Sequence, residues 1–148
     1  MSKRFVHPAL FGLLCLVLLI WQLCVPALTQ AQPQVDLSGK KVLILHEIEY
    51  NVPILVATNR ALIEVLESGG ISIRNQFYEN LDFGRNPEPE HRKKVAELLR
   101  QRYSNRQVDL IITTYAWALK FALNEGLTIF PQAPIIALYL APGIEISE

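Results

Sequence analysis

Side chains that could do chemistry gather directly after an apolar run at residues 41–46. His46 ends this run and is followed by Glu47 and Glu49, so an imidazole and two carboxylates lie close together in the sequence. Such groups could act as general acid and base, or form one side of a metal site. Neighbouring residues at a strand end point to opposite faces, however, so the three groups cannot all converge on one point. We therefore favour a histidine that packs at the strand end and bonds to a neighbouring loop, and expect neither a metal site nor catalytic residues.

A second group of ligand-type side chains is formed by Thr113, Thr114 and Tyr115, which lead from another apolar run into a predicted helix. Free amides at the start of that helix could receive a ligand carboxylate or sulfate. Thr114 could instead cap the helix through its hydroxyl, and the two roles can coexist. Tyr115 and Trp117 would either stack on a ligand or pack against a neighbouring element.

Several familiar chemistries are excluded by residue type. The loop over residues 46–53 contains no glycine, so its backbone cannot close around a pyrophosphate as a P-loop or a dinucleotide-binding loop does. Both cysteines, Cys15 and Cys24, lie within the first 31 residues, which leaves no disulfide, thiolate metal site or cysteine nucleophile beyond them. We expect no cofactor.

The elements that must position these groups alternate between strand and helix. Strands are expected at residues 41–46, 71–77, 108–113 and 134–140, and helices at 53–67, 89–103 and 116–125. The first strand is a continuous apolar run, which is typical of burial on both faces, whereas the second alternates with polar residues and suits a sheet edge. Strands separated by helices predict an α/β fold with a parallel sheet and right-handed crossovers.

Two glycine-marked helix ends are expected. Gly69-Gly70 ends the first helix where a left-handed cap is wanted, and Gly126 follows the third helix. In the first helix, the apolar positions that recur at helical spacing are Leu55, Ala61, Leu62, Val65 and Leu66. This spacing predicts the helix, and in the third helix we expect Ala118, Leu119, Ala122 and Leu123 to face inward.

A parallel α/β sheet binds its ligands beyond the carboxyl ends of its strands. This rule converts the strand assignment into a predicted site. The candidate ligand-binding residues are His46, Glu47, Tyr50, Thr113, Thr114, Tyr115 and Tyr139.

Residues 1–31 have the three parts of a secretory signal: a basic start, an apolar core at residues 9–25 and a small-residue exit ending in Ala31. The apolar core is also just long enough to span a membrane, so an uncleaved anchor stays open. Either way, the basic residues precede the apolar run and place the rest of the chain outside the cytoplasm, in the periplasm or its equivalent. Residues 32–40 read as a polar linker and residues 41–148 as the domain.

The charge balance argues against nucleic acid as a partner. Removing Lys3 and Arg4 with the leader leaves 12 basic residues against 14 acidic ones. A nucleic-acid-binding domain would show a basic excess or stripe.

The order and spacing of several short motifs resemble one family of proteins. These motifs are Lys41–His46, Asn59-Arg60, Leu81-Asp82, Leu98-Leu99 with Tyr103, Val108–Ile112, Ala118-Leu119, and Phe130-Pro131 before Pro134–Ile136. The family is that of periplasmic substrate-binding-like proteins related to ABC transporter binding proteins, also found as the sensor regions of membrane histidine kinases. The resemblance implies two flavodoxin-like lobes that close over a small-molecule solute, with a membrane permease or a kinase as partner.

The resemblance and the length together define the functional expectation. Two lobes need about twice a typical domain of roughly 100 to 150 residues, so residues 41–148 would supply part of one lobe of the type I binding-protein fold. We expect an exported, non-catalytic solute-binding protein truncated to its first lobe. The alternative is the extracytoplasmic sensor region of a histidine kinase or related receptor, and a small exported flavodoxin-like enzyme using His46 and Glu47 is less favoured. Bulky residues at 115–117, where the family often has a short polar or glycine-containing stretch, leave the ligand class open.

Overall fold

The computed structural model describes residues 35–49 and 51–140 of the chain. The predicted leader at residues 1–31 and the first three residues of the linker, 32–34, lie outside the described residues. Within the described part, no helix is both long enough and apolar enough to cross a membrane.

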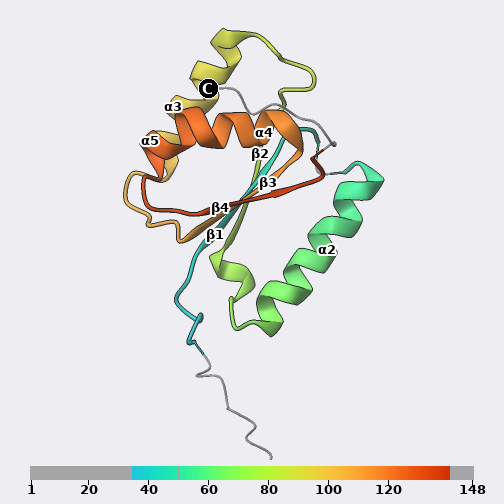
Figure 1. The fold of residues 1–148 in the computed structure, drawn as a ribbon, viewed down its shortest axis with the longest axis vertical. Helices are drawn as coiled ribbons and strands as arrows, with labels where there is room; N and C mark the ends of the chain where they lie inside the picture. Colours follow the sequence, from blue (N-terminus) through green and yellow to red (C-terminus); the bar gives the residue numbers. More distant parts are fainter. Residues whose placement is uncertain (1–34, 50, 141–148) are drawn as a thin grey trace, which may run out of the picture. The chain divides into compact units, whose positions relative to one another are not determined.

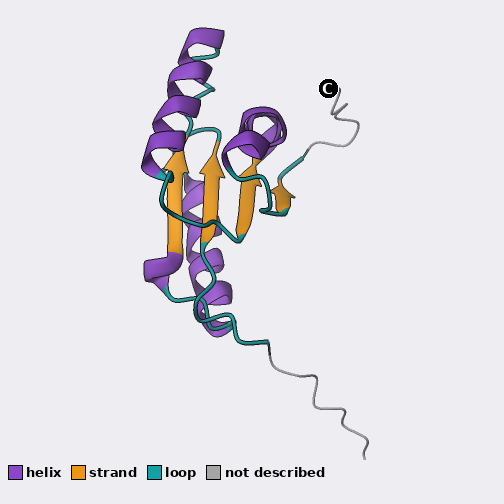
Figure 2. Ribbon diagram, turned by 90° about the vertical axis from the view of Figure 1, so that its left-hand side faces the viewer, coloured by secondary structure: helices purple, strands orange, loops and turns teal. Residues whose placement is uncertain are grey.

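Four parallel strands form the sheet, in the order β2-β1-β3-β4 (Figure 2). They are β1 (Val42–His46), β2 (Gln76–Asn80), β3 (Leu110–Thr114) and β4 (Ile135–Leu138). The predicted α/β class, the parallel pairing and the alternation of strand and helix are confirmed. Each residue of β1 is buried, which confirms the prediction that this strand lies inside the sheet.

Helices cover both faces of the sheet (Figure 1). α2 (Pro53–Ser68) lies on one face, and α3 (Pro89–Arg102) and α4 (Tyr115–Phe121) lie on the other. The two faces have separate apolar clusters because side chains alternate along each strand. Leu43 and Leu45 of β1 join the larger cluster under α3 and α4, and Val42 and Ile44 join the smaller one under α2.

The second strand begins later than predicted. Residues Ile73–Asn75 form the 3₁₀ helix η1, and β2 starts at Gln76. The Ser72 hydroxyl accepts the Arg74 amide, and the Asn75 side chain donates to the Ser38 carbonyl at 3.0 Å, so local polar groups compete with strand pairing here. The prediction that this strand lies at a sheet edge is confirmed.

The end of α2 is the predicted left-handed cap. Gly70 has φ of 93°, the Gly70 amide donates to the Glu67 carbonyl, and the Ile71 amide donates to the Leu66 carbonyl at 2.8 Å. This pair of bonds is a Schellman motif, and Ile71 packs with Leu66 as the motif requires.

The helix after β3 does not end at Gly126, contrary to the prediction. α4 continues through the π-helical turn η2 (Ala122–Gly126) into α5 (Leu127–Ile129). Gly126 keeps right-handed helical angles, with φ of −62°. The side chain of Ile129 packs against the core and the Phe130 amide bonds to the Gly126 carbonyl, so packing beyond the glycine extends the helix.

Only some of the apolar residues that recur at helical spacing in α2 face the sheet. Leu55 and Thr58 are buried and Leu62 and Leu66 pack against the sheet, whereas Ala61 and Val65 are exposed. The stripe that faces the sheet consists of positions 55, 58, 62 and 66. The remaining apolar residues of the helix, including Ala61 and Val65, lie on a side that does not face the sheet.

Candidate functional site at the carboxyl edge of the sheet

Left-handed backbone marks the carboxyl ends of three strands. Among the described residues, the non-glycine positions with positive φ are Asp82 (54°), Tyr115 (65°) and Tyr139 (58°), which follow β2, β3 and β4. Aspartate adopts this conformation comparatively easily, but for bulky side chains it is strained. Strain of this kind concentrates where ligands bind. The carboxyl edge therefore carries two strained tyrosines that the sequence had marked as candidate ligand residues.

The two tyrosine rings converge. The centroids of Tyr115 and Tyr139 are 5.7 Å apart, with a tilt of 32° between the ring planes. Tyr139 is 46% exposed. The pair thus presents partly exposed aromatic surface beyond the ends of β3 and β4.

Tyr139 is tied to α2 through its hydroxyl, which lies 2.5 Å from the Thr58 hydroxyl. Thr58 donates its own proton to the Ile54 carbonyl at 2.8 Å. Tyr139 is therefore the donor in the pair, and Thr58 Oγ1 is the acceptor. The bond fixes the ring of Tyr139 against the first two turns of α2.

His46 lies beneath this edge and is 1% exposed. It pairs in register with Thr114 across β1 and β3, and its Nδ1 lies 3.2 Å from the Thr114 hydroxyl. Tyr78 of β2 stacks on its other side, with ring centroids 6.2 Å apart. The expected bond from His46 to a loop is thus replaced by a bond to the neighbouring strand.

The second ring nitrogen of His46 faces α2. Burial lowers the pKa of His46, and the Asn59 side chain opposes this shift by interacting with the ring. His46 Nε2 and Asn59 Oδ1 are nevertheless buried without a partner in hydrogen-bonding geometry. A neutral ring that accepts from Thr114 at Nδ1 carries its proton on Nε2, which matches the free acceptor on Asn59.

Thr113 points to the opposite face of the sheet from Thr114, because side chains alternate along β3. Its side chain is completely buried, and its hydroxyl has no hydrogen-bond partner. Thr113 and Thr114 therefore do not act on one point. The Thr113 hydroxyl is enclosed within the fold, so it is not available to a solute at the tyrosine pair.

Glu47 occupies the position in which we expected a ligand carboxylate. Its Oε2 accepts the Trp117 amide at 2.6 Å. Burial raises the pKa of Glu47, while the amides of Trp117 and Ala118 oppose that rise. Thr114 precedes α4 but makes no side-chain cap, so the capping role predicted for it was wrong. The cap comes from a carboxylate 70 residues away in sequence.

The other acidic group after β1, Glu49, forms an ion pair with Arg85. Tyr50, the remaining candidate, lies outside the described residues. His46 faces α2 while Glu47 reaches the start of α4, so the structure separates the imidazole from the nearest carboxylate. No group of three or more His, Cys, Asp or Glu side chains suited to a metal occurs in the part of the chain that the structure describes.

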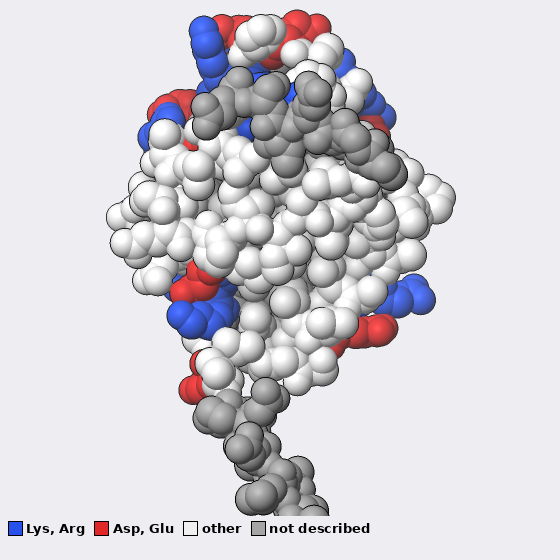
Figure 3. Space-filling model, in the orientation of Figure 1, with Lys and Arg blue, Asp and Glu red and all other residues white. Residues whose placement is uncertain are grey.

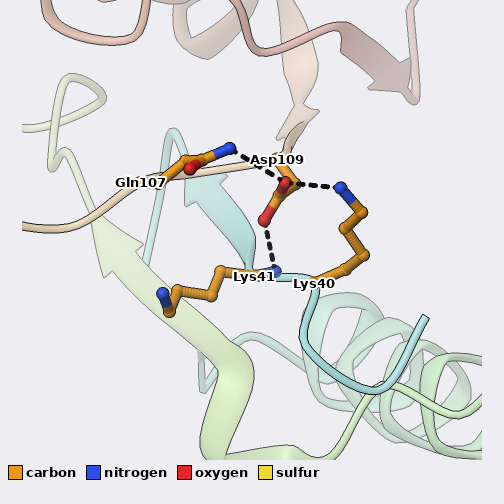
Figure 4. A network of polar contacts seen from close by, with 4 residues as sticks. All are labelled: Lys40, Lys41, Gln107 and Asp109. Carbon is orange, nitrogen blue, oxygen red and sulfur yellow. Dashed lines mark hydrogen bonds and ion pairs between the residues drawn. The ribbon is translucent and has the colours of Figure 1, made fainter. Parts of the chain in front are cut away.

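The opposite, amino-terminal edge of the sheet has a different polar network (Figure 4). Asp109 accepts the Lys41 amide and the Lys40 ammonium, each at 2.9 Å, and the Gln107 side chain at 3.3 Å. These bonds join the starts of β1 and β3 and lower the pKa of Asp109, chiefly through the Lys41 amide. The network is a brace between two strands, remote from the tyrosine pair.

Three residues that touch the candidate site were missed in the sequence: Thr58, Asn59 and Tyr78. Thr58 and Asn59 interrupt the apolar stripe of α2 on the turn that faces the sheet, and a polar residue in such a stripe is a usable signal of a buried polar contact. Tyr78 was missed because the second strand had been assigned to residues 71–77.

Comparison with models of known protein families found none that matches the chain, and comparison with curated proteins found no match. Functional inference therefore rests on the geometry of the carboxyl edge and on the residue patterns of the chain.

Proposed function

We propose that the chain binds a small-molecule solute at the carboxyl edge of its sheet, as one lobe of an exported, non-catalytic binding protein of the ABC transporter type. In this proposal the lobe is flavodoxin-like and belongs to a bilobal, type I binding-protein fold. The export signal that the proposal invokes falls on residues outside the described part of the chain.

The strand order supports a flavodoxin-like lobe. In sheets ordered 2-1-3-4, the chain leaves β1 toward one side and returns to β3 on the other, so the connections diverge between β1 and β3. Ligands of such folds bind at this switch point, beyond the carboxyl ends. His46 and Thr114 are the last residues of the two strands and lie opposite each other there.

The observation that carries the proposal is the pair of left-handed tyrosines. Tyr115 and Tyr139 begin the connections after β3 and β4, and their rings lie together at the surface. A backbone cost of about 1–2 kcal/mol per residue persists only where the surroundings impose it, and ligand clamps are typical sites. The rings offer an apolar, π-rich platform for a solute.

The polar groups around the platform support recognition rather than reaction. The His46 ring bonds within the sheet, and Glu47 bonds to α4, so each is already held by the fold. Among the described residues, Tyr139 of the platform remains 46% exposed. Closure over the solute would come from a second lobe, as in hinged binding proteins.

Calorimetric titration of the purified full chain with amino acids, sugars and small carboxylates tests this proposal. We expect weak, millimolar-range binding by at least one class, because one lobe buries only part of a solute. Tyr115→Ala and Tyr139→Ala should abolish the heat, while Ile73→Ala, an exposed change near η1, should leave it unchanged. A sub-micromolar ligand would show that a single lobe suffices, and binding that survives both tyrosine changes would place the site elsewhere.

A further inference from the structure

Two consecutive polar residues of α2, Thr58 and Asn59, meet the carboxyl edge at two different strands. The Thr58 hydroxyl lies 2.5 Å from the hydroxyl of Tyr139, directly after β4. The Asn59 side chain interacts with the ring of His46, the last residue of β1. Because Thr58 and Asn59 are neighbours on one helix, a movement of α2 that breaks one of these contacts also breaks the other.

The polar groups around His46 suit a neutral ring. Thr114 reaches Nδ1 at 3.2 Å, and His46 Nε2 is buried together with Asn59 Oδ1. When Nδ1 accepts the Thr114 proton, the single ring proton lies on Nε2 and faces the Asn59 oxygen. A second proton, on Nδ1, would oppose the proton of Thr114 and force that buried hydroxyl to turn.

A protonated His46 would also lack a counter-charge. The side chains that meet the ring are Tyr78 from β2, Thr114 from β3 and Asn59 from α2, and none of them carries a charge at neutral pH. The carboxylate next to it in sequence, Glu47, bonds to the start of α4 instead. Glu67 of α2 acts on Tyr78, where it adds to the rise in pKa that burial causes.

The charged residues of α2 point to solvent. Arg60, Glu64 and Glu67 are all exposed. The side of the molecule shown in Figure 3, to which α2 and β4 contribute, is uncharged in its middle and carries its charged side chains at its margins. Burial of a charge without a partner is costly, so a protonated His46 favours any arrangement that brings its ring into water.

The helix is the element that can move. β1 is paired on both sides, with β2 and with β3, so His46 is held in the sheet. α2 covers the ring from one face, and Val52 at its start makes no side-chain cap. The other end of α2 is fixed by the Schellman motif at Gly70 and Ile71. Its first half is therefore the part that can leave the sheet.

We propose that His46 and Asn59 form a pH-sensitive clasp, which holds the first half of α2 against the carboxyl edge while His46 is neutral and releases it when His46 is protonated. Release admits water to the ring and solvates the charge. It also separates Thr58 from Tyr139. The clasp is thus a two-state element whose equilibrium a proton shifts.

The clasp bears on the candidate solute site because Tyr139 belongs to the tyrosine pair. Once Thr58 has moved away, the Tyr139 hydroxyl loses its acceptor and the ring is no longer fixed beside Tyr115. Under the function proposed above, solute binding would weaken as the pH falls. This consequence rests on the proposed function, whereas the clasp itself is measured without any solute.

An NMR titration of the isotope-labelled full chain, from about pH 8 down to the onset of unfolding, tests the clasp. The His46 ring and the amides of Thr58, Asn59 and Tyr139 should change with one shared midpoint below 6.5. The Ile71 amide, which is bonded at the fixed end of α2, should stay constant. His46→Gln should remove the shared change from the three amides, and His91→Gln should leave it in place.

Thr58→Val tests whether the two contacts act together. This change keeps the shape of the side chain but removes the acceptor for Tyr139, so the closed form loses a hydrogen bond and the His46 midpoint should rise by about half a unit. Tyr139→Phe removes the same bond from the other side and should give the same rise. Ser68→Ala is the matched control, because it removes an α2 hydroxyl that bonds to the Val65 carbonyl, and it should leave the midpoint unchanged.

Three results would overturn the clasp. One is a His46 midpoint that does not move in Thr58→Val and Tyr139→Phe. Another is a ring that stays neutral until the Ile71 amide also loses its folded signal, because that is unfolding of the whole chain. The third is a ring that titrates while the amides of Thr58 and Asn59 hold still. Each of these results leaves solute binding to be decided by its own titration.

Discussion

His46 and Thr114 are directly opposite each other on β1 and β3, and a bond of 3.2 Å joins the imidazole to the hydroxyl. The two residues are 68 positions apart in sequence. They close the carboxyl ends of the two central strands beneath the tyrosine pair. The buried imidazole makes the stability of this edge dependent on pH.

Burial lowers the pKa of His46 below its ordinary value of 6.5, so the unfolded chain binds this proton more readily than the folded chain. Above pH 6.5, His46 is neutral in both states and imposes no penalty on folding. As the pH drops from 6.5 toward the lower pKa of the folded chain, the free energy of unfolding decreases. We expect His46→Gln to flatten this part of the profile. Urea unfolding between pH 5 and 8 measures it, and His91→Gln serves as the control. An unchanged slope in His46→Gln would show that another group is responsible.

The left-handed conformation of Tyr115 predicts that glycine is more stabilising than alanine at this position, the reverse of their order inside a helix. Tyr115→Gly and Tyr115→Ala remove the same ring, but alanine retains the Cβ that makes positive φ costly. The glycine variant should be more stable by about 1 kcal/mol. Trp117, inside the first turn of α4, is the control: Trp117→Ala should be more stable there than Trp117→Gly. Chemical unfolding of the four variants gives both differences, and the same order at both positions would refute a left-handed Tyr115.

Glu47 is predicted to stabilise the start of α4. Glu47→Ala leaves the Trp117 amide without its 2.6 Å acceptor, and loss of a helix cap costs about 1 kcal/mol. Glu64→Ala, on an exposed part of α2, should cost little. Thermal unfolding of both variants measures the effect. Equal melting temperatures for the two variants would mean that the Glu47 cap adds nothing.

Asp109 should support stability at neutral pH and lose that role in acid. Its pKa lies below the ordinary value of 3.8, so the folded chain holds this proton less tightly than the unfolded chain. The stabilisation is present above about pH 4 and disappears as the pH falls through the lower folded value. Asp109→Asn should be less stable than the native chain at pH 7, and the difference should shrink by pH 2. A constant difference over this range would contradict the brace.

The regular elements of the fold could be predicted because their residues carry strong local patterns. The continuous apolar run ending at His46 and the Gly69-Gly70 cap each specify one outcome. Gly126 misled the prediction because core contacts of Ile129 outweigh the local preference for a helix end. Likewise, the helical spacing of Val65 is compatible with either the buried or the exposed side of α2. Which side is buried depends on where the sheet lies.

The sequence predicted which edge of the sheet carries the candidate site, but it did not predict how the side chains contact one another there. The rule for parallel sheets located Tyr115 and Tyr139 at one edge, yet their positive φ angles and their contact depend on how β3 and β4 end. No local pattern could show that Glu47 caps α4, because the two groups meet only after the sheet forms. The bond between Tyr139 and Thr58 is long-range for the same reason.

The most direct test of solute binding at the carboxyl edge is amide chemical-shift mapping of the isotope-labelled full chain during titration with the solute that gives the largest heat. We predict shifts that saturate together at residues 114–118 and 138–140, with Thr58 and Asn59 following. The amides around Lys41 and Asp109, at the opposite edge, should stay unchanged. Shifts confined to the Lys41 edge, or spread evenly over the sheet, would contradict the assignment of the binding face.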